Sequence, residues 1–136
     1  MNRLLTGEQK FPTALAKQLK QRADESFCQR IDVALTDLPI PPAGWKYHLD
    51  TAVGVKLKGY CDPHEDPFFG DGDPKSHRSV FWLLSDTSRR TSHLIANGQS
   101  ASLQPNQWAF FDDADMHAFL ADGTWIGLAV QLTEEA

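Results

Sequence analysis

The chain has 136 residues, of which 41% are hydrophobic and 23% are charged, and its net charge is −5. This composition predicts one globular domain spanning residues 1–136, and no apolar run approaches the roughly 20 residues that a membrane helix needs. The acidic balance disfavours a nucleic-acid partner, and the absence of a secretory signal pattern in the first residues leads us to expect a cytoplasmic protein that binds no membrane.

The first part of the chain, residues 1–44, is expected to hold one helix and a proline-rich linker. Pro12 suits a first helical turn, and an apolar stripe at four-residue spacing predicts a helix over residues 12–30, formed by Leu15, Leu19, Ala23 and Phe27. The stretch "LPIPPAGW" cannot continue a helix because its prolines lack the backbone donor and fix φ.

The second part, residues 45–134, changes to the two-residue period of β-strands. "VGVKLK" alternates apolar and basic residues, and "SVFWLLS" is an apolar strand. Tight turns at Asn97-Gly98 and Asp122-Gly123 predict two hairpins. We count six or seven short strands, which indicate a mainly β sandwich or barrel with the helix packed on one face.

A metal site is the main functional candidate, and it centres on the stretch "GYCDPHEDPFFGDGD". In an extended segment His64 and Asp66 point to the same face because they are two residues apart. Two histidines and a carboxylate bind divalent iron and leave open positions for substrates, so a third ligand must come from another strand. His117, just after the aromatic strand 108–111, is the best placed of the remaining histidines. We expect His48, His77 and His93 to be ordinary solvated or hydrogen-bonded side chains.

The cysteines give a weaker signal. Cys28 and Cys61 fit a reducing compartment. Cys61 and His64 have the C-x-x-H spacing of some zinc sites, but no second cysteine pair follows, so a structural zinc site is the weaker reading.

The segment from about Val53 to Leu132 resembles the double-stranded β-helix of the iron(II)/2-oxoglutarate oxygenases, in particular their prolyl-hydroxylase and aspartyl/asparaginyl-hydroxylase branches. Five stretches carry this resemblance in order: "GYCDPHED", "HRSVFWLLSD", "LQPNQWAFF", "DDADMHAF" and "GTWIGLAVQL". The resemblance implies a jelly-roll or cupin-like barrel. It also implies an oxygenase with Fe(II) bound by His64, Asp66 and His117, and 2-oxoglutarate as a small-molecule co-substrate, the substrate itself being unknown.

The sequence departs from this family on its last strand. No Lys or Arg follows His117, and Trp125 stands near the place where the family has an arginine that anchors the co-substrate. Bidentate pairing with a carboxylate requires a planar guanidinium, so we expect Arg78 to be the anchor instead, with Lys75 as a distant second candidate. Asp112 is expected to orient a histidine ligand, and the loop 68–74 resembles a lid.

Two alternatives remain open. A cupin-like metal protein of the same shape would not use 2-oxoglutarate, and the missing arginine favours it, although cupins usually carry H-x-H where this chain has H-x-D. A non-catalytic binding module on the same barrel is the third reading.

Overall fold

The computed structural model describes residues 4–22 and 27–135, and one helix and eleven strands lie within them. The elements are β1 (Leu5–Glu8), α1 (Thr13–Arg22), β2 (Phe27–Arg30), β3 (Trp45–Tyr47), β4 (Val53–Lys58), β5 (Cys61–His64), β6 (His77–Asp86), β7 (Ser92–Ala96), β8 (Gln99–Leu103), β9 (Gln107–Phe111), β10 (His117–Leu120) and β11 (Thr124–Glu134). Short 3₁₀ turns occupy Leu35–Asp37 and Leu49–Thr51. In these ranges no helix is long and apolar enough to cross a bilayer.

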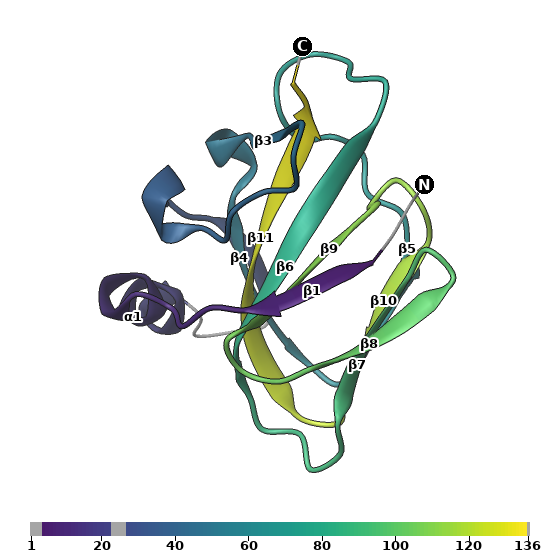
Figure 1. Cartoon of the computed structure of the whole chain (residues 1–136). Coiled ribbons are helices and arrows are strands. Elements are labelled where there is room, and N and C mark those ends of the chain that lie inside the picture. The colour runs from purple at the N-terminus through teal and green to yellow at the C-terminus, as the bar shows by residue number, and fades with distance from the viewer. Residues whose placement is uncertain (1–3, 23–26, 136) are drawn as a thin grey trace.

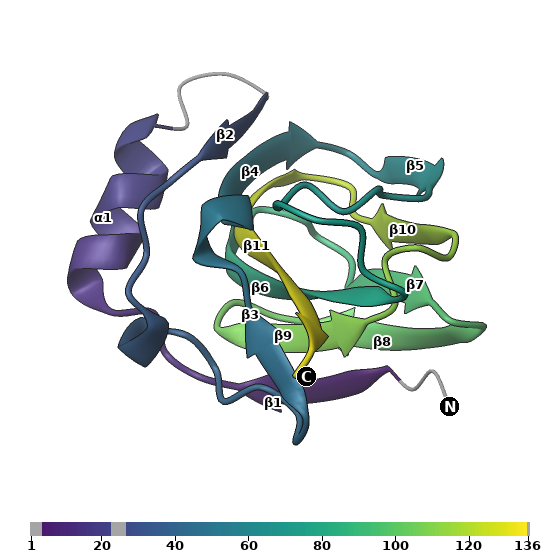
Figure 2. The same ribbon diagram turned by 90° about the horizontal axis from the view of Figure 1, so that it is seen from above.

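Two antiparallel sheets form the barrel. The larger sheet has seven strands in the order β1-β9-β6-β11-β4-β2, with β3 pairing with β11, and the smaller sheet has the order β5-β10-β7-β8. Figure 1 shows the long strands β6 and β11 side by side at the centre of the larger sheet. Figure 2 shows the two sheets facing each other, with α1 on the outer side of the larger sheet.

The alternation of side chains along the central strands creates two separate cores. In β6, Val80 and Trp82 point outward and pack with Leu15 and Leu19 of α1. Phe81 and Leu83 point inward and form the core between the two sheets with residues of the smaller sheet, such as Leu94 and Phe119. A strand that is covered on both faces reads as a nearly continuous apolar run, which is the pattern of this segment.

The helix is shorter than the sequence predicts. It ends at Arg22, and residues 27–30 form strand β2, which pairs with β4. Leu15 and Leu19 are buried as expected, whereas Ala23 lies outside the described residues. The helical spacing of Phe27 was therefore misleading, because edge pairing with β4 satisfies the backbone of this segment instead. With β1, the first 44 residues contribute two strands to the larger sheet, in addition to the expected helix.

The two predicted hairpins have different outcomes. The turn at Asn97-Gly98 joins β7 to β8, and both residues have the positive φ of a type I′ turn, 55° and 70°.

The segment at Asp122-Gly123 is no hairpin, because β10 belongs to the smaller sheet and β11 to the larger one. The Asp122 carboxylate accepts hydrogen bonds from the backbone N–H groups of Arg89, at 2.8 Å, and Arg90, at 3.2 Å. Gly123 approaches the backbone of residues 87 and 88 so closely that a Cβ atom would lie 2.5 Å from the Ser88 nitrogen. These contacts direct the chain across from one sheet to the other.

Trp82 packs against the segment that follows β1 and binds it to the larger sheet. Its side chain is fully buried, and its ring stacks on Phe11 with centroids 3.8 Å apart. The indole N–H lies 2.9 Å from the carbonyl oxygen of Gln9 and 3.3 Å from that of Asn106. This one donor therefore serves two carbonyl groups from distant parts of the chain.

Replacing Trp82 with Phe should lower the free energy of unfolding by about 2 kcal/mol, because the part-buried Gln9 carbonyl loses its donor and the Asn106 carbonyl keeps only the backbone N–H of Gln9. Urea denaturation followed by circular dichroism measures the change. Trp108→Phe is the matched control, since Trp108 is half-buried and its indole N–H donates to none of the described residues. An equal loss in both variants would assign the effect to ring size alone.

Candidate metal centre

Strand pairing brings two histidines together. In the antiparallel pair β5–β10, His64 at the end of β5 lies directly opposite His117 at the start of β10. Their ring centroids are 4.2 Å apart. His117 is 6% exposed, while the side chain of His64 is 39% exposed, so the pair lies at the boundary between the barrel interior and solvent.

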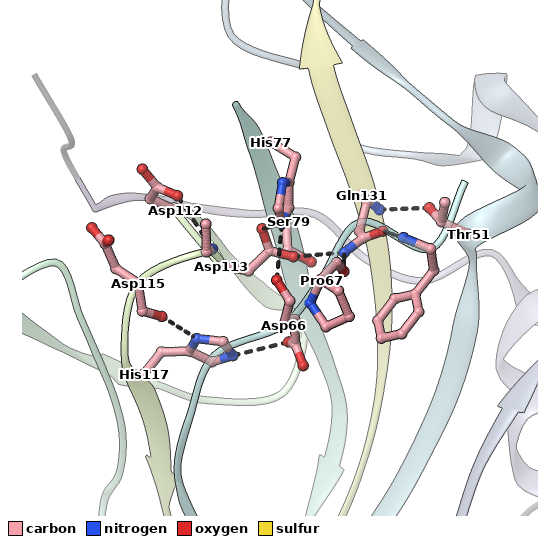
Figure 3. A network of polar contacts seen from close by, with 12 residues as sticks. Thr51, Asp66, Pro67, His77, Ser79, Asp112, Asp113, Asp115, His117 and Gln131 are labelled. Carbon is pink, nitrogen blue, oxygen red and sulfur yellow. Dashed lines mark hydrogen bonds and ion pairs between the residues drawn. The ribbon is translucent and has the colours of Figure 1, made fainter. Parts of the chain in front are cut away.

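Asp66 completes the group from the loop that follows β5. Its Oδ2 lies 3.1 Å from Nε2 of His117 and 3.7 Å from Nε2 of His64, as Figure 3 shows for His117. One ligand atom from each of the three residues lies within 4.8 Å of the others. The structure thus brings together the three residues that the sequence predicts as metal ligands.

The two imidazole rings are held in one orientation by backbone carbonyls. Nδ1 of His64 lies 2.7 Å from the carbonyl oxygen of Asp62, and Nδ1 of His117 lies 2.9 Å from that of Asp115. A carbonyl only accepts, so Nδ1 carries the proton in both rings and a neutral ring presents the Nε2 lone pair to Asp66.

The two Nε2 lone pairs and the Asp66 carboxylate repel one another unless a positive charge lies between them. Burial lowers the pKa of His117, but its hydrogen bonds to Asp66 and to the Asp115 carbonyl outweigh this and raise the pKa overall. The group therefore attracts a proton or a cation. A divalent ion satisfies both lone pairs and the carboxylate at once, so these residues fit a metal.

A second carboxylate lies behind the ligands. Asp113 is 1% exposed, and its Oδ2 accepts a hydrogen bond from Nε2 of Gln131 at 2.9 Å. Its Oδ1 has no hydrogen-bond partner among the described residues and lies 3.4 Å from Nε2 of His77. Burial raises the pKa of Asp113 to about 6. His77 in turn lies 2.9 Å from the carbonyl oxygen of Asp66, to which it can donate.

Gln131 ties the ligand loop to the last strand. Its side-chain amide, which donates to Asp113, also donates to the carbonyl of Pro67 at 2.9 Å. The oxygen of the same amide accepts a hydrogen bond from the backbone N–H of Phe69 at 2.7 Å. Its own backbone N–H donates to the Thr51 hydroxyl at 2.8 Å. The two residues that Gln131 holds in the loop follow Asp66 closely, so this amide fixes the carboxylate ligand (Figure 3).

The structure does not bring Arg78 to this group. Arg78 alternates with Ser79 along β6 and shares the outward face with Val80, and its guanidinium carbon lies 4.7 Å from the centre of the Trp45 ring. Neither Arg78 nor the exposed Lys75 lines the cavity beside the three ligands. The expected role of Arg78 as a co-substrate anchor is therefore corrected, because the two-residue period of the strand turns it to the other face of the sheet.

The structure also shows the surroundings of Trp125, Phe69 and Asp112, to which the sequence analysis gave possible roles. Trp125 is buried in the cavity wall, and its indole N–H donates to the carbonyl of Gly59 at 2.8 Å. Phe69, in the loop 68–74, is 63% exposed and also lines the cavity. Asp112 accepts a hydrogen bond from the Ala114 N–H at 3.3 Å, which makes it a turn residue. The carboxylate beside the centre is Asp113.

Sequence reasoning preferred Asp112 to its neighbour Asp113, missed Gln131 and left His77 among the ordinary histidines. Gln131 points to the inner face of β11, as Trp125 does. This alternation was the one signal in the sequence that could have placed Gln131 beside the site. A glutamine in an apolar strand does not by itself indicate which groups it will bind.

Sequence comparisons identify no relative: no family model and no curated protein matches the chain. Comparison with solved structures finds a prolyl-4-hydroxylase from Pseudomonas putida with a TM-score of 0.62 and 14% identity, covering 100% of this chain and 95% of that one. A cupin superfamily protein from Desulfitobacterium hafniense has a TM-score of 0.48 and 14% identity, covering 98% and 99%. A predicted oxalate decarboxylase from Thermotoga maritima has a TM-score of 0.44 and 15% identity, covering 60% of this chain and 64% of that one.

These identities show the fold alone. The chain has a mainly β jelly-roll fold of two antiparallel sheets with an N-terminal helix on one face, and its likeness to the Pseudomonas putida structure agrees with this, which confirms the fold class predicted from the sequence.

Replacing Gln131 with Leu should lower the affinity for a divalent metal by about 10- to 100-fold, because the Asp66 loop loses its support. It should also lower the free energy of unfolding by about 3 kcal/mol, since buried groups lose their partners. Calorimetric metal titration and urea denaturation measure the two effects. Gln104→Leu, at an exposed position, is the control. Unchanged metal affinity in folded Gln131→Leu would show that the Gln131 amide does not support the Asp66 ligand.

Proposed function

We propose that the protein is an iron(II)-dependent oxygenase in which His64, Asp66 and His117 hold the metal. The observation that carries the proposal is the convergence of two Nε2 atoms and one carboxylate oxygen, with both imidazole tautomers fixed by backbone carbonyls. Three protein ligands of this kind occupy one face of an iron ion and leave the opposite positions open. When bound there, iron would supply the activation of dioxygen.

The residues of the chain have three tasks in this proposal. His64, Asp66 and His117 bind and orient the metal, and Gln131 holds the loop that carries Asp66. The walls of the adjoining cavity are largely apolar, so they exclude water from the open side of the centre.

2-Oxoglutarate is the first candidate co-substrate. The ordered sequence motifs support it, and so does the likeness over the whole chain to the protein described as a prolyl-4-hydroxylase. A hydroxylase of this type couples the oxidative decarboxylation of 2-oxoglutarate to the hydroxylation of a substrate.

A cupin-like metal protein that does not use 2-oxoglutarate is the second candidate, and the chemistry of the cavity favours it. Among the described residues that line the cavity, none is a Lys or an Arg. The carboxylate of 2-oxoglutarate that does not reach the metal would therefore lack a cationic partner there.

Anaerobic titration with Fe(II) should show one site per chain, and alanine at His64, Asp66 or His117 should weaken binding by on the order of 100-fold or more. Calorimetry, or competition with a chromophoric chelator, measures the affinity. His93→Ala is the control, because His93 is half-buried in β7 outside the group. Metal binding that persists unchanged in His64→Ala/His117→Ala would refute the assignment of the ligands.

The two candidates differ in their response to 2-oxoglutarate. A 2-oxoglutarate-dependent oxygenase should bind this compound only when metal is present and should release succinate in air. The cupin-like alternative should bind metal with the same ligands but show neither effect. Titration calorimetry with and without Mn(II), followed by a succinate assay with Fe(II), distinguishes them.

A further inference from the structure

A cavity of about 300 Å³ extends from the metal ligands into the space between the two sheets. This volume is at the lower end of the range for small-molecule sites. The polar residues of its wall gather beside the ligands, where Figure 3 shows Thr51, Ser79, Asp113 and Gln131. The rest of the wall is mainly aliphatic and aromatic, with Val55, Leu57, Leu94, Phe81, Phe119 and Trp125 among its members.

The hydroxyl, amide and indole donors of this wall already have partners. The Thr51 hydroxyl donates to the carbonyl of His48 at 2.6 Å, and the Ser79 hydroxyl donates to that of Val130 at 3.3 Å. Both N–H bonds of the Gln131 amide are used, as is the indole N–H of Trp125. Burying a carboxylate without a donor or a cation is strongly unfavourable.

The charge of the wall also opposes an anion. Its described ionisable residues include Asp66 and Asp113, and none is a Lys or an Arg. A metal ion would offset Asp66 at the mouth of the cavity, but the deeper wall would remain without a positive group.

Three aromatic rings give the inner wall a fixed shape. Phe81, Phe119 and Trp125 meet edge to face, with centroids 5.2, 5.5 and 4.6 Å apart. Such contacts hold the rings in place, and the hydrogen bond from Trp125 to Gly59 fixes the indole further. The wall can therefore offer flat apolar surfaces to a ligand without prior rearrangement.

We infer that this cavity binds an uncharged, mainly apolar group, such as an aromatic ring or a short branched alkyl chain, beside the metal ligands. The inference rests on the proposed function only for the position of the metal, because the apolar wall exists without it. It names the class of molecule on which the centre acts, and it selects the candidate function that does not use 2-oxoglutarate.

Indole is a suitable probe because it is neutral, flat and small enough for the cavity. Calorimetric titration should show that it binds both metal-free and Mn(II)-loaded protein. Ala129 lines the cavity but is no metal ligand, so Ala129→Phe should fill the space and weaken indole binding at least tenfold while Mn(II) affinity stays the same. Ala34→Phe, at an exposed position, is the matched control, and Ala129→Leu serves if the larger side chain prevents folding.

The outcomes separate this inference from the proposed function. Indole binding that is sensitive to Ala129→Phe, in a protein that binds no metal, supports the inference and overturns the iron site. Metal binding by His64, Asp66 and His117 without any indole binding overturns the inference and leaves the iron site standing. Metal-dependent binding of 2-oxoglutarate that competes with indole would also overturn the inference, because the cavity would then accept a dianion.

Discussion

The candidate centre depends on the register between β5 and β10. His64 and His117 meet because they are direct partners in an antiparallel pair, and Asp66 reaches the same point two residues later. Side chains along a strand alternate between faces, so a shift of one residue would turn one histidine away from the other. The pairing shifts between His117 and Phe119, which confines the exact match to the end of the strand where the ligands lie.

The last strand, β11, supports the candidate centre with the side-chain amide of Gln131 and not with a cationic side chain. Gln131 uses its amide oxygen on Phe69 and its two N–H bonds on Pro67 and Asp113. A side chain whose donors are all engaged within the protein stabilises the loop but has none left for a ligand. Trp125, on the same face of the strand, contributes apolar surface, and together they give this barrel a firm ligand loop and a neutral wall.

Negative charge is concentrated where the cavity meets the ligands. Asp66 faces two imidazole rings, and Asp113 is buried behind it with one oxygen that has no hydrogen-bond partner among the described residues. Burial is the main cause of the raised pKa of Asp113, whereas hydrogen bonds to Asp66 and to the Asp115 carbonyl raise the pKa of His117 against the effect of burial. A cation at the mouth of the cavity would offset the negative charge of these carboxylates.

The sequence by itself determined the mainly β fold, the strand phase of residues 53–58, the Asn97-Gly98 turn and the three candidate ligands. These follow from local rules: the two-residue period, turn chemistry and the i, i+2 relation of His64 and Asp66. The end of the helix could not be predicted in this way, because residues 27–30 become a strand only by pairing with β4.

Tertiary structure alone decided the rest. The path after Leu120 crosses to the other sheet because Asp122 binds the backbone of residues 89 and 90, which are distant in sequence. Arg78 faces outward because the phase of β6 is set by two cores on opposite faces of the sheet. Gln131 and Asp113 became neighbours of the ligands through contacts across 18 residues of chain, and no local pattern encodes a hydrogen bond of that span.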